Sequence, residues 1–230
     1  MKKYYAHLIG LAISALSLGN SMAQSSTNAW EGAYGQIGLI GYESYIPKAS
    51  SGTTTYLGNT YSNSSTANHA NGPAANISVG YNFGINSTYT LGIGASLYPG
   101  HSRSASSTAS SAGTVSSGVY DVSNVFSFSL LPGYVIDNDR LIYAKIGYAG
   151  SNIHASSAGH YPEQVTHVNG TVYGFGYKQI ISGSIYAFGE GNYAVNRAKP
   201  VTVVTDNGAV VNSTANATGY DFIFGIGYRF

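Results

Sequence analysis

A serine hydrolase could be built from His154-Ala155-Ser156 together with Glu163, because these are the residue types of a Ser/His/acid triad. In such a triad the histidine takes the proton of the serine hydroxyl and the carboxylate orients the histidine. All three residues fall in one segment between predicted strands, and serine is the commonest residue of such segments here. A chance His-x-Ser is therefore expected, and we predict no catalytic residue.

Histidines are the second group of residues that could do chemistry, because imidazole nitrogens bind zinc and related ions. Five follow the first 23 residues: His69, His101, His154, His160 and His167. No pair has the spacing with which a helix or a hairpin enforces ligand geometry. Cysteine is absent, so thiolate ligands and disulfides are excluded. We predict solvated histidines, no metal site and no cofactor.

Charged side chains are scarce, at 8% of the chain against about 25% in an ordinary soluble domain. Five of them interrupt apolar alternating segments: Lys145, Lys178, Glu190, Asp221 and Arg229. Charges of this kind could select ions in a pore, or they could pair with one another in a packed interior. Which role applies depends on the elements that hold them.

The C-terminal segment 219–230 alternates strictly, with Phe222, Phe224, Ile226, Tyr228 and Phe230 on one face of a strand. The other face is small or charged, apart from Ile223. A membrane barrel turns its apolar face to lipid and keeps charges inside. This ending resembles the terminal strand of Gram-negative outer-membrane barrels, in which a C-terminal aromatic residue is the signal read by the assembly machinery.

The N-terminus agrees with export. Lys2 and Lys3 precede an apolar run, Leu8 to Leu18, and Ser21-Met22-Ala23 fits a small-x-small cleavage site. The run is shorter than the roughly 20 residues of a membrane-spanning helix. We predict a signal peptide over residues 1–23 and a single domain over residues 24–230.

Eight strands are predicted after that: 33–44, 76–84, 89–98, 124–135, 141–150, 171–179, 184–195 and 219–230. Long connections rich in Ser, Thr, Ala, Asn and Gly alternate with three short turns. Such an alternation is typical of an up-and-down transmembrane β-barrel with its long loops outside and its turns in the periplasm. A secreted β-sandwich also has alternating strands, but it does not account for the one-sided loop lengths or the Phe230 ending.

Strand parity gives further expectations. The last outward residues of the descending strands are aromatic, which predicts a periplasmic girdle of Phe83, Tyr134, Tyr177, Tyr228 and Phe230. In the first strand Ile37 and Leu39 point outward, so Tyr34 and Ile40 are expected to point inward. Pro132 is awkward in a closed barrel because it lacks an N–H, and it requires a bulge or a place near the rim.

By the same parity the five charged residues named above face the lumen. An eight-stranded barrel is only wide enough for side chains to fill it. We expect Glu190 to pair with Lys145 near mid-height, with Tyr143, Tyr186 and Phe188 filling the space. Small inward Gly and Ser residues leave some room for water, so a narrow channel stays open as the alternative.

Segments such as Leu141 to Tyr148, Tyr173-Gly174-Phe175-Gly176-Tyr177 and Phe188-Gly189-Glu190-Gly191-Asn192-Tyr193 look like strands five to seven of the small outer-membrane β-barrel family. That family includes opacity-type surface antigens and the membrane domain of OmpA-like proteins. The resemblance covers essentially all of residues 24–230 and implies a surface-exposed barrel of adhesive or protective role. Two departures stand out: no peptidoglycan-binding domain follows Phe230, and Gly191 and Asn192 stand where a basic residue is usual.

Function on a rigid scaffold concentrates in loops, so the expected role is structural or surface-interaction, like that of an adhesin or antigen. In the last long connection, Val201 to Thr205, Asp206-Asn207-Gly208 and Ala209 to Val211 predict an outward hairpin. A porin-like channel is the alternative, and a lipid A-modifying hydrolase is a distant third, since some barrels of this size act on lipid A. Expected partners are outer-membrane lipid and lipopolysaccharide, the assembly machinery, and a host, phage or cell-surface ligand. The low net charge gives no basis for nucleic-acid binding, and we expect a monomer.

Overall fold

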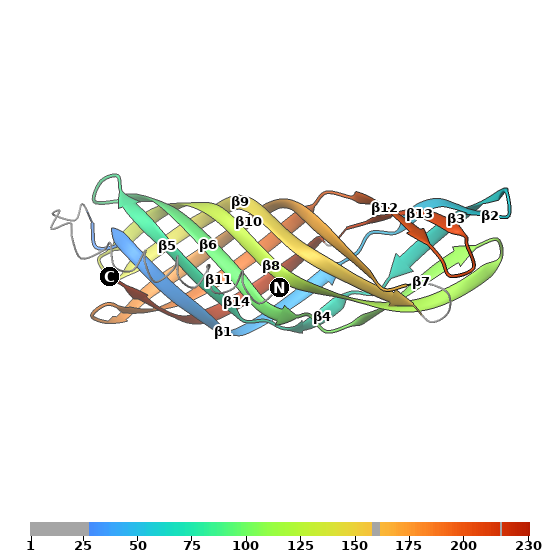
Figure 1. Ribbon diagram of the computed structural model, residues 1–230. Helices are drawn as coiled ribbons and strands as arrows, with labels where there is room; N and C mark the ends of the chain where they lie inside the picture. The colour runs from blue at the N-terminus through green and yellow to red at the C-terminus, as the bar shows by residue number, and fades with distance from the viewer. Residues whose placement is uncertain (1–27, 158–161, 217) are drawn as a thin grey trace, which may run out of the picture.

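The computed structural model describes residues 28–157, 162–216 and 218–230. Within them the chain forms fourteen strands, all paired antiparallel in one sheet (Figure 1). The described residues contain no helix that is long and apolar enough to cross a membrane. The predicted signal peptide lies outside the described part of the chain.

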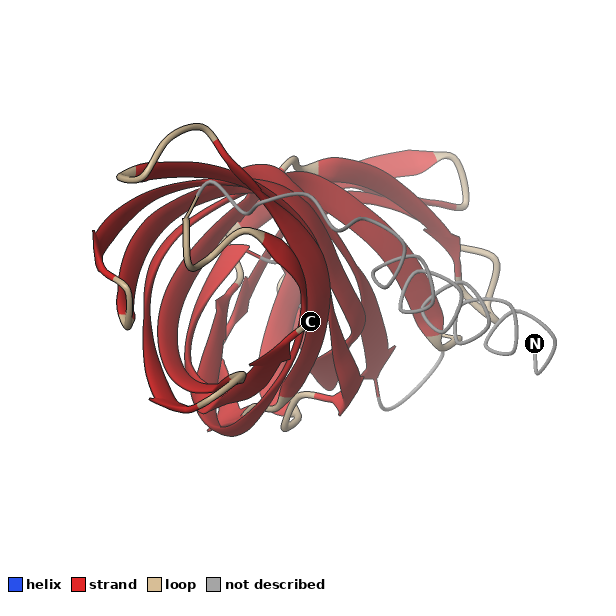
Figure 2. Ribbon diagram, turned by 90° about the vertical axis from the view of Figure 1, so that its left-hand side faces the viewer, coloured by secondary structure: helices blue, strands red, loops and turns tan. Residues whose placement is uncertain are grey.

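Eight of these strands close into a ring around a narrow interior, as the view toward the C-terminal end shows (Figure 2). Pairing of β8 with β9 closes the ring. The fold prediction is confirmed, because each of the eight predicted strands lies within or overlaps one of the ring strands. In chain order these are β1 (Gly32–Ile46), β5 (Asn76–Gly84), β6 (Tyr89–His101), β8 (Thr114–Asp137), β9 (Arg140–Ser157), β10 (Gln164–Ser182), β11 (Ile185–Asn196) and β14 (Thr218–Arg229).

The outer surface of the ring is apolar and the inner surface is polar, the inverse of a soluble protein. In β14 the outward residues Phe222, Phe224, Ile226 and Tyr228 are each about half exposed, whereas Ile223 between them is fully buried. The same alternation runs through β5, β6, β9 and β10. Such an exterior is stable only against lipid.

Exposed aromatic residues lie on the strands next to the short turns. These turns are at the end of the barrel that carries the C-terminus (left in Figure 1). Tyr134 pairs across strands with Tyr89, and their rings lie 5.7 Å apart. The five residues of the predicted girdle are all exposed and outward: Phe83, Tyr134, Tyr177, Tyr228 and Phe230.

The first strand corrects one expectation. Ile40 was expected to point inward, but its side chain is 73% exposed. A register shift between Gly38 and Ile40 in the pairing of β1 with β14 inserts one extra residue there. A bulge of this kind inverts the parity of every later residue in the strand, so both Leu39 and Ile40 face outward.

Pro132 lies within β8, opposite Leu91 of β6. Its side chain points outward. On the other side, pairing with β9 stops after Leu130 and resumes at Gly133 with the same register. The missing N–H therefore interrupts the ladder without shifting it, so no bulge is needed. Pro132 lies near the rim, as expected, because its partner Leu91 pairs in turn with the girdle residue Phe83.

Above the ring, the long connections continue the sheet. They contain six further strands: β2 (Ser50–Tyr56), β3 (Asn59–Ala67), β4 (Ala70–Pro73), β7 (Ala105–Ser111), β12 (Lys199–Val204) and β13 (Val210–Ala215). The predicted hairpin around Asp206 is confirmed as β12–β13. We call these strands, with the outer ends of β8, β9 and β10, the sheet extension (right in Figure 1). The 24 residues of β8 run for roughly 80 Å, well beyond a hydrocarbon core of roughly 30 Å.

Candidate functional site: the lumen cluster and the sheet extension

A buried ion pair crosses the middle of the lumen. Lys145 Nζ lies 2.9 Å from Glu190 Oε1, and both side chains are at most 4% exposed. The two residues come from β9 and β11, which are separated by β10 in the ring. The hydroxyl of Tyr143 donates a hydrogen bond of 2.7 Å to the other carboxylate oxygen, Oε2. Both oxygens of Glu190 therefore have donors, as a buried charge requires.

Asn192 links this pair to a second carboxylate, that of Asp221. Its amide Nδ2 lies 2.9 Å from Glu190 Oε1 and 2.9 Å from Asp221 Oδ1, so one amide group bridges the two acids. Asp221 also accepts a hydrogen bond of 3.1 Å from the hydroxyl of Tyr98. The asparagine that replaces the family's usual basic residue thus takes part in the network as a donor.

Lys178 is held by aromatic rings. Its Nζ lies 3.7 Å from the ring centroid of Tyr34, 5.1 Å from that of Tyr186 and 5.2 Å from that of Tyr143. The side chain is buried. Cation–π attraction at these distances stabilises an ammonium group that water does not reach.

Glycines of neighbouring strands make the space that these rings occupy. Gly176 is opposite Tyr143 in the β9–β10 ladder, and Gly227 is opposite Tyr186 in the β11–β14 ladder. A Cβ on either glycine would lie 2.2 Å from the tyrosine ring. The inward glycines were expected to leave room for water, but these two positions are filled by tyrosine.

Little free volume remains beside the ion pair. A cavity of about 10 Å³ is lined by residues that include Lys145, Glu190 and Ser129. Such a volume suits about one water molecule. Among the described residues, the hydroxyl of Ser129 is buried and has no hydrogen-bond partner, so a single water here would satisfy it.

Arg229, the fifth predicted lumen charge, lies apart from this group. Its guanidinium carbon is 6.0 Å from the ring centroid of Trp30, close to the C-terminal end of the barrel. We call Lys145, Lys178, Glu190, Asp221 and Asn192 with the surrounding tyrosines the lumen cluster. The cluster fills the middle of the lumen, where the cavity beside the ion pair measures only about 10 Å³.

The residues of the hydrolase hypothesis do not assemble into a triad. His154 Nε2 lies 2.8 Å from the hydroxyl of Ser123, not from that of Ser156. Among the described residues no hydrogen bond joins Ser156 to His154 or to Glu163, and Glu163 is exposed. The required proton relay is therefore absent from this arrangement.

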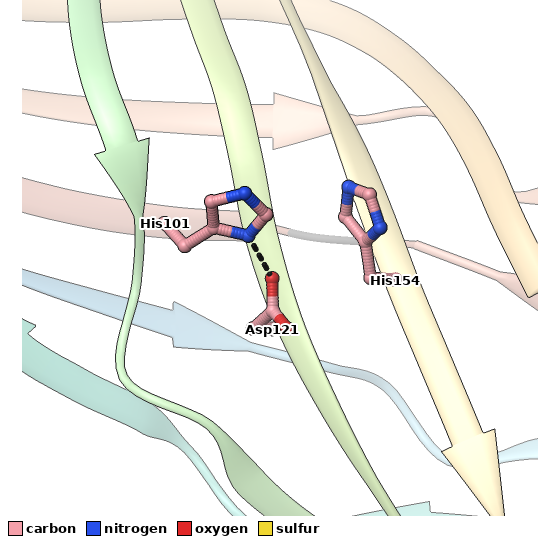
Figure 3. A group of neighbouring side chains, drawn as sticks. All are labelled: His101, Asp121 and His154. Atoms are coloured by element: carbon pink, nitrogen blue, oxygen red, sulfur yellow. Dashed lines mark hydrogen bonds and ion pairs between the residues drawn. The ribbon is translucent and has the colours of Figure 1, made fainter. Parts of the chain in front are cut away.

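Three side chains of metal-binding type meet on neighbouring strands. His101 of β6, Asp121 of β8 and His154 of β9 present ligand atoms within 4.8 Å of one another (Figure 3). Of the histidines grouped from the sequence, His167 contacts Asn152 instead, and His160 lies outside the described residues. Prediction from sequence missed Asp121 and His101, because they are 20 residues apart and only the strand pairing joins them.

The sheet extension has its own small core and a concave face. Tyr120 is central to the core, since its hydroxyl donates to the carbonyl of Asn68 at 2.6 Å and accepts from the N–H of Ala70 at 3.1 Å. Burial raises the pKa of Tyr120, which lies above the membrane-spanning part of β8, to about 12. The concave face encloses about 550 Å³, lined mainly by Ser, Thr and Asn side chains with Tyr56 and Tyr61.

Comparison with known proteins agrees with this architecture. The sequence profile of the outer membrane protein beta-barrel domain matches residues 9–230. The fold is similar to that of the outer membrane protein OprG from Pseudomonas aeruginosa, with a TM-score of 0.56 and 11% identity over 90% of this chain and 99% of that one. A weaker similarity links it to Ail, the attachment invasion locus protein of Yersinia pestis, solved with the heparin analogue sucrose octasulfate. The TM-score is 0.43, with 16% identity over 86% of this chain and 99% of that one. Another weak similarity is to the outer membrane protease OmpT of Escherichia coli, with a TM-score of 0.43 and 12% identity over 92% of this chain and 100% of that one. No curated protein sequence matches the chain.

Proposed function

Because the chain belongs to the outer membrane protein beta-barrel domain family and resides in the bacterial outer membrane, we propose that it is a closed, non-catalytic monomeric barrel that carries a surface-interaction sheet. The membrane-spanning ring serves as the anchor. The sheet extension serves as the binding element, in the manner of an adhesin or surface antigen.

The observation that carries this proposal is the occluded lumen. An ion pair, a bridging asparagine and three tyrosine rings lie where a channel would need a continuous column of water. The 10 Å³ cavity beside Lys145 and Glu190 has room for about one water molecule. Conduction would require this network to open, which would leave charges without partners in a low-dielectric interior.

The sheet extension supports the second half of the proposal. A channel needs only loops at its mouth, whereas this chain devotes six extra strands to a folded surface above the ring. Among the described residues β12 pairs only with β13, which leaves its other edge free. A free strand edge offers backbone hydrogen bonds to an extended peptide. Ser, Thr and Asn residues line the neighbouring concave face together with Tyr56 and Tyr61, so a ligand there would meet apolar surface as well as hydroxyl and amide groups.

Single-channel recording of the protein refolded from residues 24–230 tests the closed lumen. We expect no steady openings from the folded protein, and the variant Glu190→Ala serves as a positive control that loosens the network. Regular openings of the unmodified protein would refute the closed barrel and support the narrow channel, with Lys145 and Glu190 as its selectivity residues.

Cell attachment tests the surface role. Bacteria that display the full protein are compared with bacteria that display a variant in which the β2–β3 and β12–β13 hairpins are replaced by short turns. Surface amounts are matched with an antibody to the ring. We expect the variant to lose attachment to host-cell layers, and equal attachment of the two strains would contradict a binding role of the extension.

A further inference from the structure

Strand pairing brings two imidazoles and a carboxylate together from β6, β8 and β9 (Figure 3). Asp121 and His154 are direct partners in the β8–β9 ladder. His101 reaches them from β6, where a register shift between Tyr98 and His101 displaces the end of that strand. Neighbouring interior residues such as Val122 and Ile153 are buried, which fixes the backbone under the three side chains.

The side chains are close to the separation that a bound ion would impose. His101 Nδ1 lies 2.7 Å from Asp121 Oδ1, and the two imidazole centroids are 5.1 Å apart. Zinc binds nitrogen and oxygen at about 2.0–2.2 Å, so tetrahedral ligand atoms lie roughly 3.3 Å from one another. The His101–Asp121 contact would open slightly, and the widest separation between ligand atoms, which is within 4.8 Å, would have to close to about the same value.

We propose that His101, Asp121 and His154 form a zinc site on the extracellular side of the barrel, with a fourth position open to water or an external ligand. Two imidazoles with one carboxylate suit zinc and exclude the all-oxygen shells that Mg²⁺ and Ca²⁺ prefer.

Two further features fit this assignment. Ser123 Oγ lies 2.8 Å from His154 Nε2. With Nδ1 of His154 as the metal-binding nitrogen, this contact has the role of a supporting partner that holds the ring in place. The His101 side chain is 59% exposed and that of Asp121 is 25% exposed, so an ion can enter from solvent.

Calorimetric titration of the tag-free protein with ZnCl₂, after removal of metal with a chelator, tests the site. The protein is refolded in detergent micelles from residues 24–230. We expect saturable binding of one Zn²⁺ and no binding of Mg²⁺. The variants His154→Gln and Asp121→Asn should each weaken binding by at least about tenfold, and Ser123→Ala by about tenfold through loss of the supporting partner.

Controls separate this site from unspecific histidine binding. His69→Gln and His167→Gln make the same substitution outside the cluster and should leave the affinity unchanged. Folding of each variant is checked by its heat-dependent migration in gels, and Co²⁺ in place of zinc should give a tetrahedral visible spectrum that Asp121→Asn alters. Equal affinity of the cluster variants and the unmodified protein, or absence of saturable binding, would overturn the proposal and leave His101 and Asp121 as a surface hydrogen bond only.

Discussion

Replacement of Glu190 by glutamine perturbs the lumen cluster with little change of shape. The cluster holds two cations, Lys145 and Lys178, and two acids, Glu190 and Asp221, so its formal charge is balanced. Glu190→Gln keeps an oxygen that can accept from Tyr143 and removes the charge that faces Lys145 at 2.9 Å. Two buried cations then share one acid.

The expected loss of stability follows from burial. Lys145 and Glu190 side chains are 3% and 4% exposed, so solvent screens the uncompensated charge very little. Removal of one partner from a buried pair costs about 3–5 kcal/mol. Because glutamine preserves part of the hydrogen bonding, we expect a loss of about 3 kcal/mol in the free energy of unfolding, near the lower end of that range.

Urea unfolding in detergent micelles measures this loss through tryptophan fluorescence. The chain has one tryptophan, Trp30, which is 3% exposed and lies 5.7 Å from the ring of Tyr186. Its emission therefore reports on the barrel interior. Glu163→Gln, at an exposed position just before β10, provides the matched substitution without burial.

A double-mutant cycle decides whether the pair itself is responsible. Lys145→Met alone should also destabilise the barrel, because it leaves Glu190 charged and buried. The double variant should be more stable than the sum of the single losses predicts, with a coupling of about 0.5–3 kcal/mol. An unchanged midpoint for Glu190→Gln, or strict additivity in the double variant, would refute the reasoning.

Three further predictions concern other parts of the barrel. Gly176→Ala places a methyl group 2.2 Å from the Tyr143 ring and should lower the free energy of unfolding in urea by about 1–3 kcal/mol. Gly35→Ala has open space around its Cβ and should lower it less. Equal losses in the two variants would argue against the tyrosine contact. Phe230→Ala should lower the folded fraction in cell envelopes, measured by heat-dependent gel migration, whereas Phe175→Ala, an equally lipid-facing change in mid-strand, should not; equal yields would exclude Phe230 as an assembly signal. The folded protein holds the Tyr120 proton more tightly than the unfolded chain. The sheet extension should therefore keep this contribution to stability below pH about 10, the ordinary tyrosine value, and lose it as pH rises through about 12. Circular dichroism should detect a larger alkaline loss in the unmodified protein than in Tyr120→Phe.

The ring was predictable because lipid imposes a simple rule on it. Every second residue of a spanning strand must be apolar, and in β14 the run from Phe222 to Tyr228 obeys this rule without exception. The same parity placed Lys145 and Glu190 in the lumen, where the structure brings them together. The rule fails at Ile40, because a bulge depends on the neighbouring strands and leaves no mark in the periodicity.

The sheet extension was harder to predict because no lipid-facing stripe marks its strands and its apolar core is small. Ser104 to Ser111 has no apolar alternation, yet most of it forms β7. Without a lipid-facing stripe, neither the strand register nor the meeting of His101 with Asp121 can be deduced from spacing. The tyrosine–glycine pairs could not be deduced from spacing for the same reason, since Gly176 and Tyr143 are brought together only by the ladder between their strands.

Continuity of β8, β9 and β10 from the membrane into the sheet extension has a thermodynamic consequence for recognition. A long flexible loop loses conformational entropy when a partner fixes it, and that loss weakens binding. Here the ordering cost is met during folding, because the same strands that span the membrane hold the surface above it. A ligand of this surface would meet a preformed shape, so sequence changes on its exposed side could alter affinity without any new cost of ordering the backbone.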